Sequence, residues 1–285
     1  MADPLTLLAV HAHPDDESIA TGGTLVRYTA EGIRAVLVCC TRGEEGEIHD
    51  PALDPVEAAP RLGAIREREL RDAAAILGVE EVYMLPYRDS GMAGTAANAR
   101  PDNFMNADPR AAAARVAAII RATRPAVVVT YDPGGGYGHP DHKKAHQVTL
   151  GAIEQATADG DGGPGWTVPK LYYTVVSLSA LLSVNSAMAA RGLPAPFRED
   201  EHAFDIRQLA VPDDRITARV AVGDYLDTVR EARRAHRTQL TDDDPLLALP
   251  RDIAGRAFAV ESYVRASNSA PDRSDIEDDL FAGPR

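Results

Sequence analysis

Cysteine is scarce in this sequence. Of 285 residues only two are cysteines, Cys39 and Cys40, and they are adjacent within an apolar stretch that is predicted to form a strand. Neighbouring side chains of a strand point to opposite faces, so these two thiols are not expected to form a disulfide with each other. Both are interpreted as buried free thiols.

The sequence also lacks segments that direct a protein into or across a membrane. It contains no run of about 18 apolar residues, so no transmembrane helix is expected. The N-terminal Met-Ala-Asp-Pro has neither the basic nor the apolar region of a signal peptide. We therefore expect a cytoplasmic protein without a membrane partner.

Basic residues are fewer than acidic residues in this sequence. There are 30 Lys and Arg against 43 Asp and Glu, which gives a formal net charge of −13. A nucleic-acid-binding protein normally carries a basic face, so this balance argues against a nucleic-acid partner. One basic cluster, residues 230–237, falls on a predicted helix and is interpreted as a solvated face of that helix. Nothing in the sequence indicates a protein partner.

A chain of this length with 45% hydrophobic residues can bury a full core. Its first part alternates apolar strands with helical patterns, and each crossover is long enough for parallel pairing. The expected strands are 5–10, 33–40, 81–85 and 126–131, and the helices that follow them are 18–31, 60–77, 109–123 and 142–157. We therefore predict an α/β fold with a Rossmann-like, doubly wound, mainly parallel sheet.

The pattern is weaker after a Gly- and Asp-rich loop at 158–168. Strands are expected at 170–176, 216–222 and 258–264, helices at 179–191 and 224–240, and an acidic tail at 271–285. We predict a metal-binding catalytic core of residues 1–168 and a smaller C-terminal lobe of residues 169–285 that completes the substrate pocket. In the first helix, Gly22 and Gly23 are each unfavourable by roughly 1 kcal/mol relative to Ala, so we expect a close backbone approach there.

Two polar stretches follow the first and the fourth expected strands. His-Ala-His-Pro-Asp-Asp-Glu occupies residues 11–17, and Gly-His-Pro-Asp-His occupies residues 138–142. In doubly wound sheets ligands bind outside the carboxyl ends of the strands. We therefore expect the two stretches to meet at one edge of the sheet, beside the long loops at 41–59 and 86–109.

The residue types in these stretches suit a divalent metal ion. A catalytic zinc site needs three protein ligands and an open position for water, and the candidates are His13, Asp16, His139 and His142. Two histidines and one carboxylate also bind Fe(II), so the residue types leave Zn²⁺ and Fe²⁺ open. The histidine that is not a ligand would be free for chemistry.

Neighbouring residues add acid–base groups to the predicted site. Asp15 is the natural general base for metal-activated water. Asp141 is available to keep a histidine cationic, so that the imidazolium could stabilise an oxyanion and protonate a leaving amine. Tyr137 lies between glycines and offers a hydroxyl on a loop that can move.

Simpler interpretations exist for each feature by itself. A single histidine at a strand end is usually a packing or capping residue, and Asp16 could be the N-cap of the next helix. The glycines at 134–138 could be taken for a phosphate loop, but no Gly-Lys-Ser or Gly-Lys-Thr follows them. The pairing of two such stretches at two strand ends favours a metal site.

The paired motifs resemble those of the zinc-dependent de-N-acetylase superfamily, which contains the N-acetylglucosaminyl-phosphatidylinositol de-N-acetylases and related bacterial enzymes. The sequence is most similar to the actinobacterial branch that deacetylates N-acetylglucosaminyl-inositol in mycothiol biosynthesis. The stretches that carry the resemblance are 10–18, 43–47, 88–95, 127–142 and 166–183. The C-terminal third resembles the family only weakly.

The resemblance implies a metal-dependent amide hydrolase that acts on a small-molecule N-acetyl amino sugar. It implies one Zn²⁺ per subunit, held by His13, Asp16 and His142, with Asp15 as the general base. It implies that His139, tuned by Asp141, is the cationic partner of the oxyanion and leaving group, and that Tyr137 polarises the amide carbonyl. The implied contacts to sugar and inositol are Glu47, Arg66, Asp89 and Met92.

Two other activities of the same superfamily stay open. The mycothiol S-conjugate amidases carry a Lys shortly after the first motif, whereas this sequence reads Ser18-Ile19-Ala20, which favours a deacetylase. Ala20 departs from the small hydroxyl residue that is typical of that deacetylase. A deacetylase that tailors a natural-product sugar is the other alternative.

Overall fold

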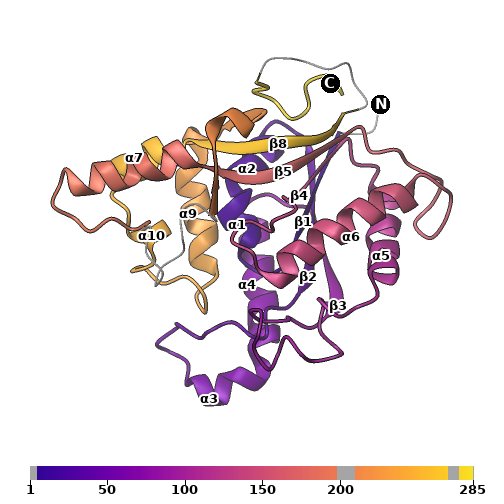
Figure 1. The fold of residues 1–285 in the computed structure, drawn as a ribbon, viewed down its shortest axis with the longest axis horizontal. Coiled ribbons are helices and arrows are strands. Elements are labelled where there is room, and N and C mark those ends of the chain that lie inside the picture. The colour runs from indigo at the N-terminus through magenta and orange to yellow at the C-terminus, as the bar shows by residue number, and fades with distance from the viewer. Residues whose placement is uncertain (1–4, 198–208, 269–275, 285) are drawn as a thin grey trace.

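A computed structural model describes residues 5–197, 209–268 and 276–284 (Figure 1). The strands are β1 (Thr6–His11), β2 (Arg34–Thr41), β3 (Glu81–Tyr87), β4 (Val127–Tyr131), β5 (Lys170–Ser177), β6 (Ala210–Val211), β7 (Ala218–Ala221) and β8 (Val260–Asn268). The helices are α1 (Asp16–Ala20), α2 (Gly22–Ala30), α3 (Pro55–Ala58), α4 (Leu62–Ile76), α5 (Pro109–Thr123), α6 (Pro140–Ala156), α7 (Leu178–Ala189), α9 (Leu226–Ala235), α10 (Pro245–Ala248) and α11 (Arg251–Ala257).

The strands form one sheet in the order β3-β2-β1-β4-β5-β8-β7, with β6 paired to β5. The pairs from β3 through to β5 are all parallel, whereas β8 is antiparallel to both β5 and β7. The strand order reverses at β1, because β2 and β3 lie on one side of it and β4 and β5 on the other. The predicted Rossmann-like, mainly parallel sheet is confirmed.

Helices cover both faces of this sheet, which is why its strands are almost entirely apolar. Figure 1 shows α5 and α6 on one side and α2, α4 and α9 on the other. Alternate residues of β1 belong to different cores: Leu7 packs with the α2 and α4 side, and Leu8 packs with the α5 and α6 side. Cys39 packs in the same core as Leu7, and Cys40 packs in the same core as Leu8. Both are buried free thiols, as predicted.

The first predicted helix is interrupted at Thr21, so α1 and α2 are separate. Thr21 has a φ of −139°, outside the helical range. Its hydroxyl donates to the carbonyl of Glu17 and lies 2.9 Å from Nε2 of His11. Because of this interruption, α1 ends at Ala20, three residues after the first polar stretch.

The chain beyond residue 168 continues the same sheet. β5 pairs with β4 from Lys170 onward, and β8 and β7 extend the sheet further. The predicted 224–240 helix is shorter, since α9 ends at Ala235, and it packs against α4. The division at residue 168 stays a prediction, and residues 269–275 and 285 of the predicted acidic tail lie outside the described residues.

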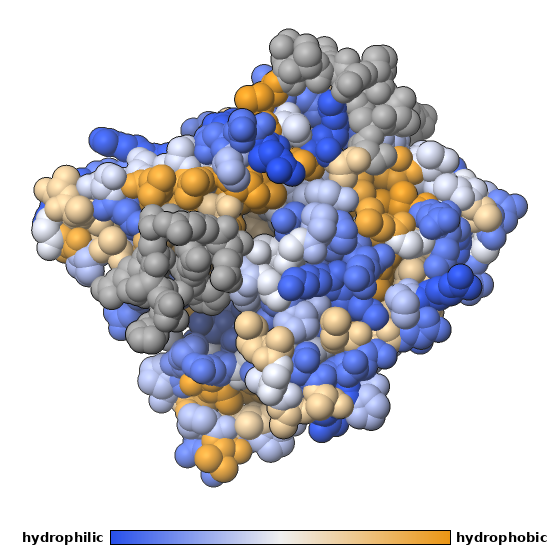
Figure 2. Space-filling view, viewed as in Figure 1, coloured by the Kyte–Doolittle hydropathy of each residue, from blue (hydrophilic) through white to orange (hydrophobic). Residues whose placement is uncertain are grey.

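The surface seen in Figure 2 is mostly polar, with apolar residues gathered over α7. Within the described ranges, no helix has both the length and the apolar character needed to cross a membrane.

The expected close approach is found at Gly23. A Cβ placed there would lie 2.6 Å from Cβ of Val222, which immediately follows β7. The main-chain N–H of Gly23 also donates to Oε1 of Glu261 at 2.7 Å. The glycine therefore lets α2 lie directly on the C-terminal strands.

Gly23→Ala should destabilise the protein by about 1–3 kcal/mol, because the added methyl group overpacks this contact. The matched control is Gly255→Ala in α11, where an added Cβ meets nothing within 4 Å. That control should stabilise the helix by about 0.5–1 kcal/mol. Urea unfolding measures both, and equal effects of the two substitutions would contradict the close approach.

Candidate functional site

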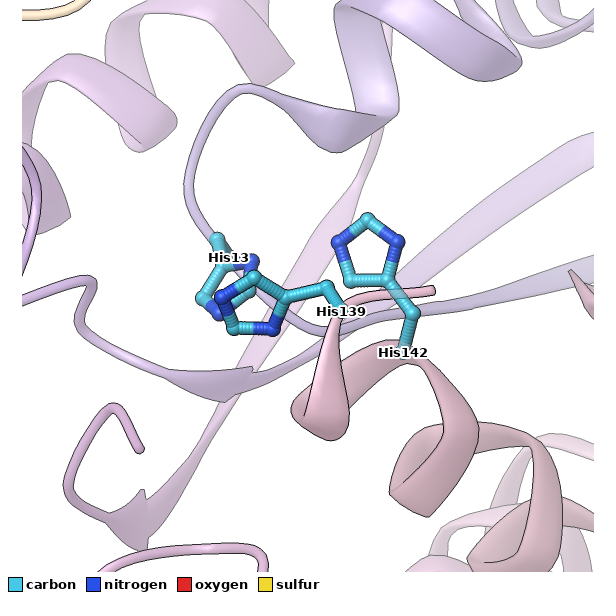
Figure 3. A group of neighbouring side chains, drawn as sticks. All are labelled: His13, His139 and His142. Atoms are coloured by element: carbon cyan, nitrogen blue, oxygen red, sulfur yellow. The ribbon is translucent and has the colours of Figure 1, made fainter. Parts of the chain in front are cut away.

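Parallel pairing of β1 with β4 brings the two polar stretches to the same edge of the sheet. Leu7 is in register with Val127 and Ala9 with Val129, so both strands end at this edge. Figure 3 shows His13, from the loop after β1, beside His139 and His142 at the start of α6. One ring nitrogen of each histidine lies within 4.8 Å of one from each of the other two, and all three side chains are buried. The two stretches therefore meet as expected.

Asp16 turns its carboxylate toward two of these imidazoles. Oδ2 lies 3.4 Å from Nδ1 of His13, and Oδ1 lies 3.4 Å from Nε2 of His142. Oδ2 also accepts the main-chain N–H of His13 at 2.8 Å and the hydroxyl of Tyr131 at 2.7 Å. Asp15 holds the N-cap position of α1, and its side chain makes no capping hydrogen bond. The capping interpretation of Asp16 is therefore wrong.

His142 presents a nitrogen that the protein itself leaves unsatisfied. Its Nε2 is buried and has no hydrogen-bond partner among the described residues. The Tyr131 ring stacks on the imidazole, with centroids 4.1 Å apart. Burial lowers the pKa of His142 to about 3, so the ring is neutral. Buried polar atoms are rarely left unpaired, and a neutral imidazole nitrogen beside a carboxylate is a donor set that a metal ion would satisfy.

Nδ1 of His13 faces Asp16, and Nε2, the second ring nitrogen, faces two further carboxylates. Nε2 lies 3.3 Å from Oδ2 of Asp141 and 3.6 Å from Oδ1 of Asp89. Burial acts against the charged imidazole, but Asp89, Asp141 and Asp16 outweigh it and raise the pKa of His13 well above its ordinary value. A histidine that binds a metal usually donates its second N–H to a carboxylate, and Asp141 stands in that place.

A second convergent group consists of His13, Asp89 and Asp141. Here the carboxylates already have partners within the protein. Asp141 accepts from the N–H of Ser90 at 2.9 Å and from the Ser90 hydroxyl, and Asp89 accepts from the N–H of Gly91 at 2.8 Å. These two residues therefore act as hydrogen-bond acceptors that order the loop after β3 around His13.

His139 is bonded to Asp141 through the main chain of that residue and not through its carboxylate. The main-chain N–H of Asp141 donates to Nδ1 of His139 at 3.1 Å. The carboxylate of Asp141 contacts Ser90 and His13. As an acceptor at Nδ1, His139 is neutral and carries its proton on Nε2. Burial, with a contribution from His13, lowers the pKa of His139 to about 4.

Asp15 lies next to Asp16 in an unusual backbone conformation. Its φ is 123°, a value that residues with a Cβ rarely adopt. Burial raises the pKa of Asp15 to about 6, with Arg66 acting in the opposite direction. Arg66 is 3% exposed and donates to Oδ2 of Asp15 at 3.0 Å, to the carbonyl of Pro14 and to that of Gly43. Its guanidinium therefore holds Asp15.

The remaining predicted residues lie around this cluster or on its loops. The Tyr137 ring centroid is 5.0 Å from that of His142 and 6.0 Å from that of His139. The glycines beside it, Gly136 and Gly138, both have positive φ. Among the predicted substrate contacts, Asp89 is buried, whereas the side chains of Glu47 and Met92 are exposed.

The interpretation of residues 230–237 as a solvated face is wrong at two positions. Arg233 is buried and donates to the carbonyl of Ser18 at 3.1 Å. His236 is fully buried, with Nε2 2.7 Å from Oε1 of Glu17. Both follow Val229 at the spacing of one helix face, and that periodicity is the signal that could have placed them inside. Tyr131 and Ser90 were also missed, because nothing in their local sequence marks them.

Comparisons with known proteins agree with this geometry. Residues 8–153 match the family model PIG-L, GlcNAc-PI de-N-acetylase. A protein of Acidothermus cellulolyticus is 46% identical over 98% of this chain and 94% of its own length, and one of Geodermatophilus obscurus is 43% identical over 97% of each. Both are named 1D-myo-inositol 2-acetamido-2-deoxy-alpha-D-glucopyranoside deacetylase.

A solved structure shows the same fold. The N,N'-diacetylchitobiose deacetylase of Pyrococcus horikoshii aligns with a TM-score of 0.60 at 20% identity, over 92% of this chain and 84% of its own. The family match covers the sheet edge where both polar stretches meet, and the two bacterial relatives align over nearly the whole chain. The chain therefore belongs to the PIG-L family of de-N-acetylases.

Proposed function

We propose that this protein is a zinc-dependent hydrolase that removes the N-acetyl group from an N-acetylglucosaminyl glycoside. The substrate we assign is 1D-myo-inositol 2-acetamido-2-deoxy-alpha-D-glucopyranoside, which occurs in the names of both bacterial relatives. That substrate belongs to mycothiol biosynthesis. The observation that carries the proposal is the convergence of His13 and His142 on one carboxylate, Asp16, with the buried Asp15 beside it.

His13, Asp16 and His142 are the proposed metal ligands. Nδ1 of His13 lies 3.4 Å from Oδ2 of Asp16, and Nε2 of His142 lies 3.4 Å from Oδ1, the other oxygen of the same carboxylate. Each nitrogen is therefore close enough to the carboxylate for both to bind one metal ion. The unpartnered Nε2 of His142 supports the same assignment. A bound metal ion supplies an acidified water and polarises the amide carbonyl. One Zn²⁺ per chain is proposed, with Fe²⁺ as the alternative that the same donor types accept.

Asp15 is the proposed general base. It takes a proton from water as the oxygen bonds to the amide carbon, and it returns that proton to the sugar nitrogen as the C–N bond breaks. The products are acetate and the free amine. Arg66 is proposed to orient this carboxylate, to which it donates at 3.0 Å, and its expected contact with the substrate stays a prediction.

Two donors near the imidazole cluster are proposed to stabilise the oxyanion. The N–H at Nε2 of His139 and the hydroxyl of Tyr137 can both donate to the carbonyl oxygen as it gains charge. A neutral imidazole is too weak an acid to protonate an amine, so leaving-group protonation is assigned to Asp15. Asp141 is proposed to act through His13, which it contacts directly.

Sugar recognition is proposed to use the loops that follow β2 and β3. Asp89 is placed beside His13, within 3.6 Å of Nε2, and can accept from sugar hydroxyls near the metal. Glu47 and Met92 have exposed side chains on these two loops, where they can meet the inositol.

Removal of the metal should abolish acetate release from this substrate. The protein is stripped with a chelator, its metal content is checked by elemental analysis, and acetate is measured before and after addition of Zn²⁺. Activity should return with about one Zn²⁺ per chain. Full activity in verified metal-free protein would refute the mechanism, and a much faster reaction with a mycothiol S-conjugate would reassign the substrate.

Asp15→Asn should lower kcat by about 10²-fold or more, the scale of a general base. Zinc content should stay at the wild-type level, because Asp15 is not a proposed ligand. Single-turnover acetate release and elemental analysis measure the two effects. Wild-type kcat in the variant would remove Asp15 from the mechanism.

Tyr131→Phe should weaken zinc binding by about 10- to 100-fold, the usual effect of losing a group that orients a ligand. The substitution keeps the ring that stacks on His142 but removes the hydroxyl bonded to Asp16. Competition with a fluorescent chelator measures the affinity. The control is Tyr28→Phe, whose hydroxyl donates to Asp279 instead. Equal zinc affinity in the two variants would count against Asp16 as a ligand.

A further inference from the structure

The segment 233–239, at the end of α9 and just beyond it, contacts the first polar stretch from the C-terminal part of the chain. Arg233 donates to the carbonyl of Ser18, and His236 pairs with Glu17. The side chains of Glu17 and His236 are both fully buried. A buried ionic pair stabilises a fold no better than apolar residues of the same size, so this pair calls for an explanation beyond stability.

Glu17 connects His236 to the main chain of Asp15. One carboxylate oxygen, Oε1, accepts from His236 at 2.7 Å, and the other, Oε2, accepts the main-chain N–H of Asp15 at 3.0 Å. Asp15 is the residue with φ of 123°. An unfavourable φ persists only where surrounding contacts hold it, and the Glu17 carboxylate is such a contact.

The same segment also contacts α4, the helix that carries Arg66. Thr238 donates its N–H and its hydroxyl to the two oxygens of Glu69 on α4, at 2.9 and 2.6 Å. Glu69 lies about one helical turn beyond Arg66, which donates to the Asp15 carboxylate at 3.0 Å. The segment 233–239 thus contacts Glu17, which holds the backbone of Asp15, and it contacts the helix that carries Arg66, which holds the carboxylate of Asp15.

We propose that Glu17 and His236 are positioning residues that hold Asp15 in its unfavourable conformation, so that its carboxylate faces the metal site. This rests on the proposed function, in which Asp15 is the base. Without the Glu17 carboxylate, the Asp15 N–H loses its acceptor and the backbone relaxes toward negative φ. The carboxylate then moves away from the attacking water, while the three proposed ligands stay in place.

Glu17→Ala and His236→Phe should each lower kcat for acetate release by about 10²-fold, the effect of misplacing a catalytic group by about 1 Å. KM and zinc content should stay near wild-type values. Glu17→Gln and His236→Gln keep a hydrogen-bond donor and an acceptor at these positions. They should therefore retain most of the activity that Glu17→Ala and His236→Phe lose. In an Asp15→Asn background, Glu17→Ala should cause little further loss, because both changes act through the same group.

The matched control is Lys170→Met, which breaks another buried ion pair. Nζ of Lys170 lies 2.8 Å from Oε1 of Glu277. Lys170 begins β5, at the amino ends of the parallel strands, whereas the site lies at their carboxyl ends. This variant should lower the Tm but leave kcat of the folded, zinc-loaded protein unchanged. If His236→Phe does not fold, His236→Asn, whose side chain is too short to reach Glu17, provides the same test.

Two outcomes would overturn the proposal. The first is that kcat in Glu17→Ala and His236→Phe stays at the wild-type value, or falls only in proportion to the folded fraction and the zinc content, as in Lys170→Met. The other is a crystal structure of a His236 variant in which Asp15 keeps its positive φ. The crystallographic result does not depend on activity. If wild-type protein releases no acetate, the proposed function fails, while the φ of Asp15 still decides the positioning role.

Discussion

The parallel pairing of β1 with β4 is the constraint on which the site depends. Because the two strands run side by side in the same direction, their following segments leave the sheet at one edge. One segment brings His13 and Asp16, and the other brings His139 and His142 at the start of α6. The apolar residues of both strands are buried under helices on each face, which fixes this pairing more firmly than local contacts at the site could.

Around this edge most of the buried carboxylates accept hydrogen bonds from neighbouring residues. The Asp16 carboxylate accepts from Tyr131 and from the His13 main chain, and Asp141 accepts from Ser90. Nε2 of His142 is one of several buried nitrogens without a hydrogen-bond partner in the described part of the chain, and it lies 3.4 Å from Oδ1 of Asp16. Unpaired buried atoms are costly, so a nitrogen left open beside a carboxylate indicates a place kept for a ligand, in agreement with the family to which the chain belongs.

Sequence reasoning succeeded where the signal is local. Apolar runs and helical periodicity located β1, β2, β4, α4, α5 and α6, and the spacing of the two His-Pro-Asp stretches located the imidazole cluster. It did not predict which side-chain atoms contact one another. The carboxylate of Asp141, which was expected to act on His139, contacts His13, and Arg66 has a bond to Asp15 that was not expected. Sequence spacing places such residues near one another, but it does not say which atoms meet.

The sequence by itself determined the alternation of strands and helices, the edge at which the polar residues emerge, and the donor types available to a metal ion. These follow from periodicity and from residue chemistry, which need no knowledge of distant parts of the chain. Only the tertiary structure decided that His236 reaches Glu17 and that Asp15 takes a positive φ. Both depend on how α9 packs beside α1 and α4. Helical periodicity can indicate that His236 is buried, but it does not indicate which distant residue His236 contacts.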